Sequence, residues 1–166
     1  MKKNIVLIGF MGSGKSTVAR ELGKRLKADV LASDALIEHK EGQTIHEIFE
    51  SKGEDYFRDL EQGIIKDLAL REGIVIDCGG GIVLRKDNLK NLKANGIVFY
   101  LQASPEVIYQ RIKHEKHRPL LQVSDPLGRI KELYNQRLPL YNQADFTIDA
   151  NGATIEGPVV EILKKI

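Results

Sequence analysis

Short runs of consecutive apolar residues alternate along this chain with longer segments in which apolar residues recur every three or four positions. The short runs predict strands that are buried on both faces of a sheet, where no polar alternation is needed. They occupy residues 5–8, 30–31, 74–76 and 97–101, and Phe-Thr-Ile at 146–148 is a fifth strand candidate. Because strands alternate with helices, the pattern predicts an α/β fold with a parallel sheet.

The helical segments are marked by their spacing and by the residues that begin them. Val18, Leu22 and Leu26 lie four positions apart and predict a helix over residues 16–27. After a break at Gly53, a longer helix is expected to carry on one apolar face Phe57, Leu60, Ile64 and Leu68. Capping residues and prolines predict further helices near 44–49, from 104, at 124–141 and at 158–165.

Length and composition narrow the class of protein. The chain has 166 residues, with no repeat, no low-complexity tract and no long linker, so one domain over residues 1–166 is expected. Lys and Arg number 25 and Asp and Glu number 23, and a net charge of +2 argues against a nucleic-acid partner. We also expect a monomer.

The cellular location is predicted from the single cysteine and from the apolar runs. Cys78 alone permits no internal disulfide, which favours a reducing compartment. The run Ile5–Ile8 is shorter than the core of a signal peptide, which needs about 7 to 15 residues. No apolar stretch approaches the roughly 20 residues that span a bilayer. The chain is therefore expected to be cytoplasmic, with no membrane partner.

A phosphate-binding pattern follows the first predicted strand. Residues 9–16, GFMGSGKS, match G-x-x-x-x-G-K-[ST] in full, between a strand and a helix. The glycines let backbone N–H groups surround a phosphate at the positive end of the helix. Lys15 is predicted to reach the β- and γ-phosphates of ATP, and Ser16 to hold Mg²⁺ as the cofactor. The residues expected to bind ATP are Gly12, Ser13, Gly14, Lys15, Ser16 and Thr17.

The alternative for this pattern is a chance glycine-rich turn before a helix. The strand, the spacing and the Lys-Ser pair favour nucleotide binding, which does not by itself separate a kinase from an ATPase. The chain contains neither N-K-x-D nor another guanine-reading motif, so GTP is disfavoured.

Further polar residues follow the second and third strands. Ser33-Asp34 and Asp77 therefore point to the same edge of the sheet as the phosphate loop, since ligands bind at the carboxyl ends of parallel strands. Gly79–Gly81 is either a simple turn or a place where a ligand approaches bare backbone. Arg58 and Glu61 share a helix face, and their spacing alone favours an exposed ion pair over a site role.

A basic segment follows the fourth strand. It is polar and lacks periodicity, so a lid is expected over about residues 113–124, where it would exclude water and supply cations to a transferring phosphoryl group. Arg118 is the best candidate for that role, and a solvated loop is the alternative. The basic side chains here are Arg111, Lys113, His114, Lys116, His117 and Arg118.

Together these residues resemble the shikimate kinase family. The phosphate loop is shared by many families, but its combination with Phe57-Arg58, the triple glycine and an arginine before Pro-Leu-Leu is far more specific. The matches follow in order and cover nearly the whole chain. They are Gly9–Thr17, Ser33-Asp34, Gly53-Glu54, Phe57-Arg58, Glu61, Gly79–Gly81, Arg118–Leu121, Arg137 and Tyr141.

The resemblance implies a P-loop NTPase-type three-layer fold, with a five-stranded parallel sheet in the order 2-3-1-4-5 and a lid loop. It implies transfer of the γ-phosphoryl group of ATP to the 3-hydroxyl of shikimate, a step of aromatic amino acid biosynthesis. The expected partners are thus two small molecules, ATP and shikimate.

The resemblance also assigns roles to residues of the acceptor site. Arg58 and Arg137 would grip the substrate carboxylate, which suits the guanidinium fork. Asp34 would hydrogen-bond the ring hydroxyls and accept the reacting proton. Backbone N–H groups of Gly80 and Gly81 would face the substrate, and Glu61 would orient Arg58.

On the nucleotide side, the resemblance implies that Arg111 covers the adenine and that Arg118 neutralises developing phosphoryl charge. The family usually carries an acid that acts on Mg²⁺ at the position of Ala32, and Ser or Thr near the position of Asp77. Two interpretations stay open. Either Asp77 takes over the metal role, or it caps the following turn while Ala32 weakens metal binding.

Two rival functions are also open. One is a related kinase that acts on another small hydroxylated metabolite. The other is a nucleotide-binding regulatory module without turnover, which only Ala32 favours.

Overall fold

The computed structural model describes residues 2–115 and 117–166, so Lys116 of the predicted lid lies outside the described residues. Five strands form one sheet in the order β2-β3-β1-β4-β5, and all four pairings are parallel. The predicted sheet and its strand order are confirmed. The strands are β1 (Asn4–Ile8), β2 (Val30–Ala32), β3 (Val75–Asp77), β4 (Gly96–Gln102) and β5 (Phe146–Asp149).

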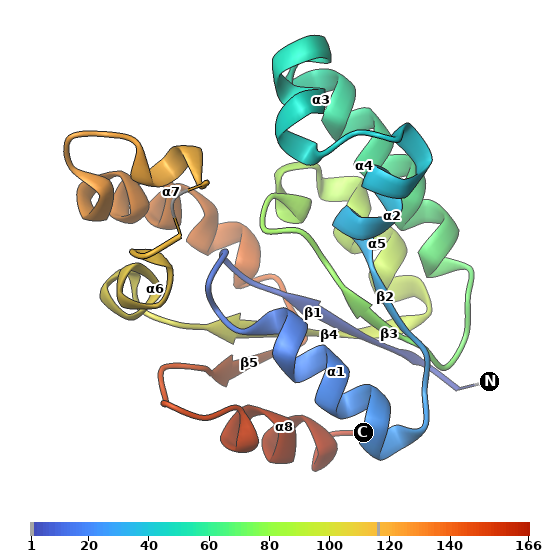
Figure 1. Cartoon of the computed structure of the whole chain (residues 1–166). Helices are drawn as coiled ribbons and strands as arrows, with labels where there is room; N and C mark the ends of the chain where they lie inside the picture. The colour runs from blue at the N-terminus through green and yellow to red at the C-terminus, as the bar shows by residue number, and fades with distance from the viewer. Residues whose placement is uncertain (1, 116) are drawn as a thin grey trace.

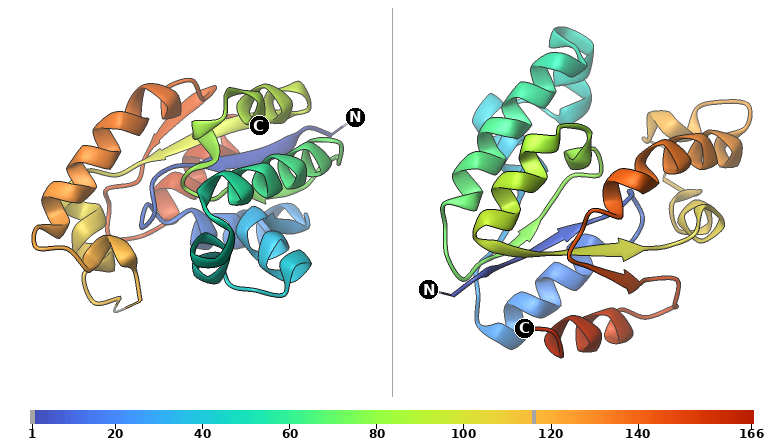
Figure 2. Two further views of the ribbon diagram at one scale, coloured as in Figure 1. Left: turned by 90° about the horizontal axis from the view of Figure 1, so that it is seen from above. Right: turned by 180° about the vertical axis from the view of Figure 1, so that it is seen from behind.

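Helices cover both faces of this sheet (Figures 1 and 2). Successive side chains of β1 point to opposite faces, so Ile5 and Leu7 join one core and Val6 and Ile8 the other. The first core contains residues of α1 (Lys15–Leu26) and α8 (Glu156–Leu163). The second contains residues of α4 (Glu54–Ala69), α5 (Lys86–Ala94), α6 (Pro105–Ile112) and α7 (Pro126–Tyr141). The predicted three-layer fold is confirmed.

A third, smaller core joins the helices between β2 and β3. Ile37 of α2 (Ser33–Glu41), Ile48 of α3 (Ile45–Lys52) and Phe57 of α4 are its buried members. The predicted capping box begins α3, where Thr44 Oγ1 accepts from the Glu47 amide at 3.2 Å and Glu47 Oε2 accepts from the Thr44 amide at 2.8 Å. These helices form an arm beside the β2 edge of the sheet (Figure 1).

Some elements differ from the expectation. The pattern predicts neither α2 nor α5, because α2 has consecutive rather than periodic apolar residues and α5 carries few apolar residues. The predicted apolar face of α4 is wrong in part. Phe57 and Leu68 are buried, but Glu61 and Ile65 are buried in place of Leu60 and Ile64. The reason is that α4 packs against both the sheet and the α2–α3 arm.

Two further observations concern the chain as a whole. The helix α8 begins two residues before Pro158, which is compatible with a proline in the first turn. Among residues 2–115 and 117–166, no helix combines the length and the apolar composition needed to cross a membrane.

Candidate active site

The phosphate loop joins β1 to α1 at the carboxyl edge of the sheet. Gly12 and Gly14 have φ angles of 77° and 94°, a region that residues with a Cβ rarely adopt. A Cβ on Gly12 would also lie 2.8 Å from Ile112 Cγ2 of α6. The glycines of the motif are therefore needed both for the turn and for its packing, as the nucleotide-binding interpretation requires.

Lys15 lies at the bottom of this loop. Its ammonium donates to the carbonyl oxygens of Gly9 at 2.7 Å and Phe10 at 3.0 Å, and the residue is only 8% exposed. Burial lowers the pKa of Lys15, and the carboxylates of Asp77 and Asp34 oppose that shift. The cation is thus held in a poorly solvated place beside two acids, where its attraction for an added phosphate is strengthened.

Ser16 and Asp77 meet across the sheet edge. The Ser16 hydroxyl donates to Asp77 Oδ2 at 2.6 Å. Asp77 ends β3, and it is paired in register with Ala32 of β2 on one side and Leu7 of β1 on the other. The acid thus stands one strand away from the position where the sequence lacks one.

These two groups fit Mg²⁺ in their chemistry. A hydroxyl and a carboxylate are hard oxygen ligands, and Mg²⁺ in phosphoryl-transfer sites usually takes one or two protein ligands besides phosphates and water. Among residues 2–115 and 117–166, no group of three or more His, Cys, Asp or Glu side chains could hold a metal alone. The donor set therefore suits a cation that arrives with a nucleotide.

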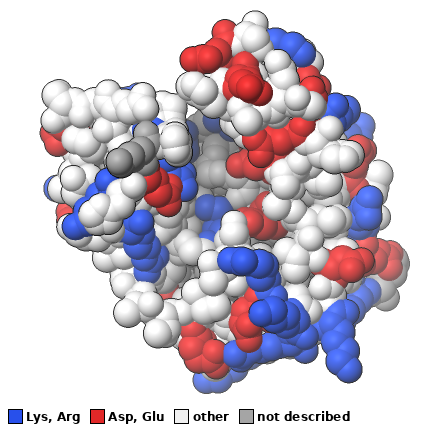
Figure 3. All heavy atoms as spheres, in the orientation of Figure 1, with Lys and Arg blue, Asp and Glu red and all other residues white. Residues whose placement is uncertain are grey.

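A cleft of about 570 Å³ opens over these residues. The space-filling view shows the surface hollowed between the lobe of α6 and α7 and the lobe of α3 and α4 (Figure 3). The polar and charged side chains that line the cleft are Lys15, Ser16, Thr17, Asp34, Glu38, Asp77, Glu115 and Arg118.

Asp34 projects into the cleft from the first turn of α2. Burial raises the pKa of this carboxyl, the nearby charges of Asp77 and Glu38 add to the shift, and Lys15 opposes it. A carboxylate with a raised pKa is a better proton acceptor than one in water, provided that the pH keeps it ionised.

The triple glycine turn follows β3 and passes between three of the predicted site residues. A Cβ on Gly79 would lie 2.5 Å from Asp34 Oδ1, and one on Gly81 would lie 2.4 Å from both terminal nitrogens of Arg58. A Cβ on Gly80 would lie 3.8 Å from Arg137 Nη1. The segment is thus a turn whose bare backbone is approached by charged side chains, and the approach of a ligand to it stays a prediction.

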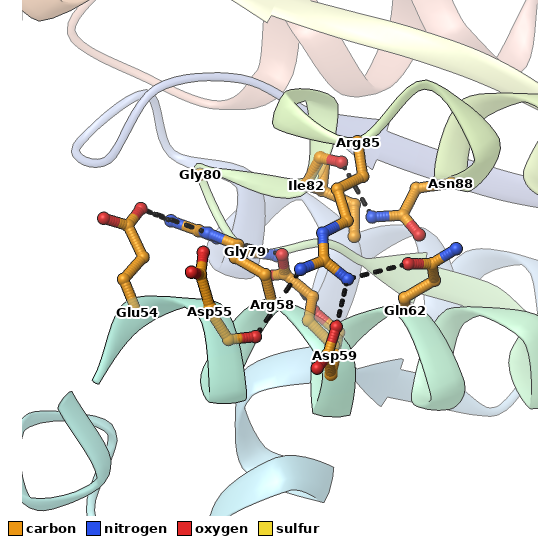
Figure 4. A network of polar contacts seen from close by, with 12 residues as sticks. Glu54, Asp55, Arg58, Asp59, Gln62, Gly79, Gly80, Ile82, Arg85 and Asn88 are labelled. Carbon is orange, nitrogen blue, oxygen red and sulfur yellow. Dashed lines mark hydrogen bonds and ion pairs between the residues drawn. The ribbon is translucent and has the colours of Figure 1, made fainter. Parts of the chain in front are cut away.

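Arg58 and Glu61 do not form the exposed ion pair that their spacing favours. Glu61 is 1% exposed and Arg58 11%, and Arg58 Nη1 donates to Glu61 Oε1 at 2.9 Å. Burial raises the pKa of Glu61, while the Arg58 guanidinium lowers it. That expectation is wrong because α4 turns this face toward the glycine segment. Glu54 also contacts Arg58, at 3.4 Å (Figure 4).

Arg137 reaches the same turn from α7. Its guanidinium lies over the Phe10 ring at 5.6 Å, next to Gly80. One helical turn further on, the Tyr141 hydroxyl donates to the Gly80 carbonyl at 2.5 Å. The structure thus brings Arg137, Arg58 and Asp34 together around one short stretch of backbone.

Arg111 lies on the other side of the phosphate loop. It donates to the carbonyl of Gly12 at 3.2 Å and to those of Ala150 and Gly152 at 2.6 and 2.8 Å. A second pocket of about 130 Å³ opens here, lined by Arg111, by the phosphate loop and by residues 150 and 152–155. A flat ring bound beside the loop could occupy this pocket, as predicted for adenine.

Arg118 lines the main cleft just before the short 3-10 helix Pro119–Leu121. Its Nε forms an ion pair with Glu115, and Nη1 lies 3.5 Å from Met11 Sδ of the phosphate loop. The predicted lid arginine is therefore within the cleft, next to the loop that holds Lys15.

Several residues in or beside this site received no role from the sequence. Glu38 lines the cleft and accepts a hydrogen bond from the Ile45 amide at 3.0 Å. Its position four residues after Asp34 places it on the same helix face, but only once α2 is known to be a helix. Tyr141 matched the family without a role, and Arg85 carried no signal.

Comparisons with known proteins cover nearly the whole chain. The family model described as shikimate kinase matches residues 11–166. The chain belongs to the shikimate kinase family. A shikimate kinase of Thermodesulfovibrio yellowstonii is 48% identical over 98% of this chain and 94% of that protein. One of Caldanaerobacter subterraneus subsp. tengcongensis is 44% identical over 98% and 95% of the two chains.

Solved structures show that the fold of this chain is that of shikimate kinases. A shikimate kinase from Acinetobacter baumannii in complex with shikimate is 40% identical and covers 99% of this chain and 93% of its own, with a TM-score of 0.93. A gluconokinase from Sinorhizobium meliloti is 19% identical with a TM-score of 0.58, covering 98% of this chain and 88% of its own, which shows a shared fold alone.

Proposed function

We propose that this protein transfers the γ-phosphoryl group of ATP to the 3-hydroxyl of shikimate. One observation supports this proposal above the others. Arg58, Arg137 and Asp34 converge on the glycine turn at the edge of the cleft that contains Lys15. A small acid with several hydroxyls needs such a pairing of guanidinium groups with a carboxylate.

The chemistry is mainly positioning and charge neutralisation. Lys15 and Arg118, which both line the cleft, neutralise the γ-phosphate, and Arg111 borders the adenine. Asp34 accepts the proton of the attacking hydroxyl as the bond from γ-phosphorus to the bridging oxygen breaks. The products are ADP and the phosphate ester, with the proton left on Asp34.

The acceptor is held by its carboxylate. Arg58 and Arg137 approach the glycine turn from α4 and α7, so the carboxylate binds between two helices that belong to different lobes. Glu61 fixes one guanidinium by a buried hydrogen bond, and the backbone N–H groups of Gly80 and Gly81 face the ring.

The metal is assigned to Ser16 and Asp77, with Asp77 standing in for the acid that is absent at Ala32. Ala32 and Asp77 are register partners on neighbouring strands, so the carboxylate of Asp77 lies only one strand away from the position where the family usually has an acid. This short displacement supports the assignment. Mg²⁺ held by these two residues would neutralise negative charge on the phosphates of ATP. Both substrates and all assigned residues meet in one chain, which supports a monomer, and the proposed location is the cytoplasm.

The metal assignment is tested by Asp77→Ala, with the affinity of the protein–ADP complex for Mn²⁺ or Mg²⁺ measured by paramagnetic resonance or calorimetry. We expect the affinity to fall about tenfold or more, the loss typical for groups that tune a metal site. Asp67→Ala on the exposed face of α4 is the control. Unchanged affinity in Asp77→Ala would leave Asp77 as a turn cap only.

The acceptor is tested by coupled measurement of ADP release with shikimate and with related hydroxylated acids and alcohols. We expect shikimate to give the highest kcat/KM, and Arg58→Ala to raise the KM for shikimate at least about tenfold with the KM for ATP unchanged. A carboxylate-free acceptor that outperforms shikimate would favour another metabolite kinase. Tight ATP binding without acceptor-dependent ADP release would favour a regulatory module.

A further inference from the structure

A guanidinium outside the cleft connects the glycine turn to α4. Arg85 directly follows the 3-10 helix Ile82–Leu84, which continues from Gly81. Its Nη1 donates to Asp59 Oδ1 at 2.5 Å and to Gln62 Oε1 at 2.9 Å, and Nη2 lies 3.5 Å from the Asp55 carbonyl (Figure 4). One side chain thus reaches three groups along two turns of α4.

The partners of Arg85 form a ridge of α4 next to the ridge that carries the acceptor site. Residues 55, 59 and 62 are spaced by four and three, as are residues 54, 58 and 61, and the second set is offset from the first by one position. Any shift of α4 relative to the turn therefore moves Arg58 against Gly81.

The contact between Arg58 and Gly81 leaves little room for such a shift. There is no space for a Cβ between the guanidinium and the Gly81 backbone. On its other side the turn is fixed to α5, where the buried Asn88 donates to the Ile82 carbonyl at 2.9 Å. Arg85 joins this fixed turn directly to α4 by polar contacts.

We propose that Arg85 is a positioning residue for the acceptor site, which sets the distance between α4 and the glycine turn and so the place of the Arg58 guanidinium. This inference rests on the proposed function, because it takes the acid bound by Arg58 to be shikimate. Packing of Ile65 and Leu68 against Leu89 and Leu92 holds the two helices together without Arg85, so its loss displaces the site without unfolding it.

The test compares Arg85→Ala and Arg85→Lys with the unmodified protein. Removing the guanidinium is expected to raise the Kd for shikimate, measured by calorimetry, by about three- to tenfold. This is the change in affinity expected when one charged hydrogen bond and one partly exposed ion pair are lost. The KM for shikimate should rise in parallel, while kcat and the KM for ATP stay within about twofold. A lysine at this position can reach one of the three partners but not all of them. The Kd of Arg85→Lys for shikimate should therefore lie between those of the unmodified protein and Arg85→Ala.

A matched control is available on the far side of the sheet. Arg25 also joins two helices, donating to Glu21 of α1 and to Glu156 of α8, and it is 35% exposed compared with 31% for Arg85. Arg25→Ala should lower Tm about as much as Arg85→Ala without changing the Kd for shikimate. If both variants change Tm and the Kd alike, or if Arg85→Ala leaves the Kd unchanged, Arg85 has a structural role alone.

A second readout needs no substrate. The amides of Ile82 and Leu84 donate to the carbonyls of Gly79 and Gly81 at 3.1 Å, so their hydrogen exchange reports on the turn. We expect exchange at these two amides to be faster in Arg85→Ala and unchanged in Arg25→Ala. If the unmodified protein does not bind shikimate, the proposed function fails; if exchange at the turn is the same in every variant, the positioning by Arg85 fails.

Discussion

At the scale of single residues, burial gives the carboxyl of Asp34 its chemistry. The raised pKa means that the folded protein holds the Asp34 proton more tightly than the unfolded chain does. Folding stability therefore falls as pH rises from about 3.9, the ordinary value for Asp, through the raised folded value. The site thus keeps a proton acceptor at a cost in stability, as functional groups in poorly solvated places usually do.

The Asp34→Asn variant separates the effect of Asp34 on catalysis from its effect on stability. Because the carboxylate must be ionised to accept a proton, kcat/KM of the unmodified protein should fall on the acid side, at a pH above the ordinary pKa of Asp. In the variant, kcat/KM should be about 10²–10⁴-fold lower and should no longer fall toward acid pH. The variant should also have a higher Tm than the unmodified protein at neutral pH. An equal Tm at neutral pH, or an acid limb that persists in the variant, would contradict the assignment.

Several residue identities were predictable because they follow the strand ends. Asp34 and Asp77 come at the ends of apolar runs, and parallel strands bring such positions to one edge. Lys15 and Ser16 follow instead from the spacing of the phosphate-loop motif. The burial of Glu61 was not predictable, since an arginine and a glutamate three residues apart look the same on an exposed helix. The rotation of α4 about its axis determines whether Glu61 is buried, and that rotation depends on helices that are distant in sequence.

At the scale of elements, the strands were easier to predict than the helices that carry the acceptor site. Four of the five strands contain an uninterrupted apolar run, and β5 has the β-favouring sequence Phe-Thr-Ile. By contrast α2 and α5 show no clear period, and they are helical because the sheet and α4 cover their apolar residues. Tertiary packing overrides weak local preference in such cases.

The glycine turn offers a prediction at this scale. Gly81 has φ −93°, so alanine fits its backbone, but the new Cβ would displace the Arg58 guanidinium, the far end of a flexible side chain. Gly81→Ala should therefore keep its Tm within a few degrees while the KM for shikimate rises about tenfold or more, since misplacement near 1 Å is costly for a positioned group. The KM for ATP should not change.

Gly63→Ala is the matched control for that experiment. Gly63 lies within α4 and has no heavy atom within 4 Å of an added Cβ. Alanine there should raise stability by about 0.4–1 kcal/mol and leave both KM values unchanged. A normal KM for shikimate in Gly81→Ala would mean that Arg58 does not bind the acceptor.

At the scale of the whole molecule, the cleft separates two lobes that carry different parts of the reaction. The α2–α4 arm provides Asp34 and Arg58, while the lobe of α6 and α7 provides Arg111, Arg118 and Arg137 (Figures 1 and 3). The order of these residues was predictable from the family resemblance. The contacts of Arg118 with Glu115 and with Met11 were not, because residues outside regular elements have no period from which their partners follow.

This arrangement predicts how Arg118 acts. ADP lacks the γ-phosphate, so Arg118→Ala should leave the Kd for ADP within about threefold while kcat falls about 10²–10³-fold, as when one group that stabilises transition-state charge is removed. Arg129→Ala, which removes an exposed guanidinium of α7 paired with Glu132, should change neither quantity. If Arg118→Ala instead weakens ADP binding and kcat by the same factor, Arg118 holds the nucleotide in every state, and the neutralisation of the transferring phosphoryl group must come from Lys15 and the metal alone.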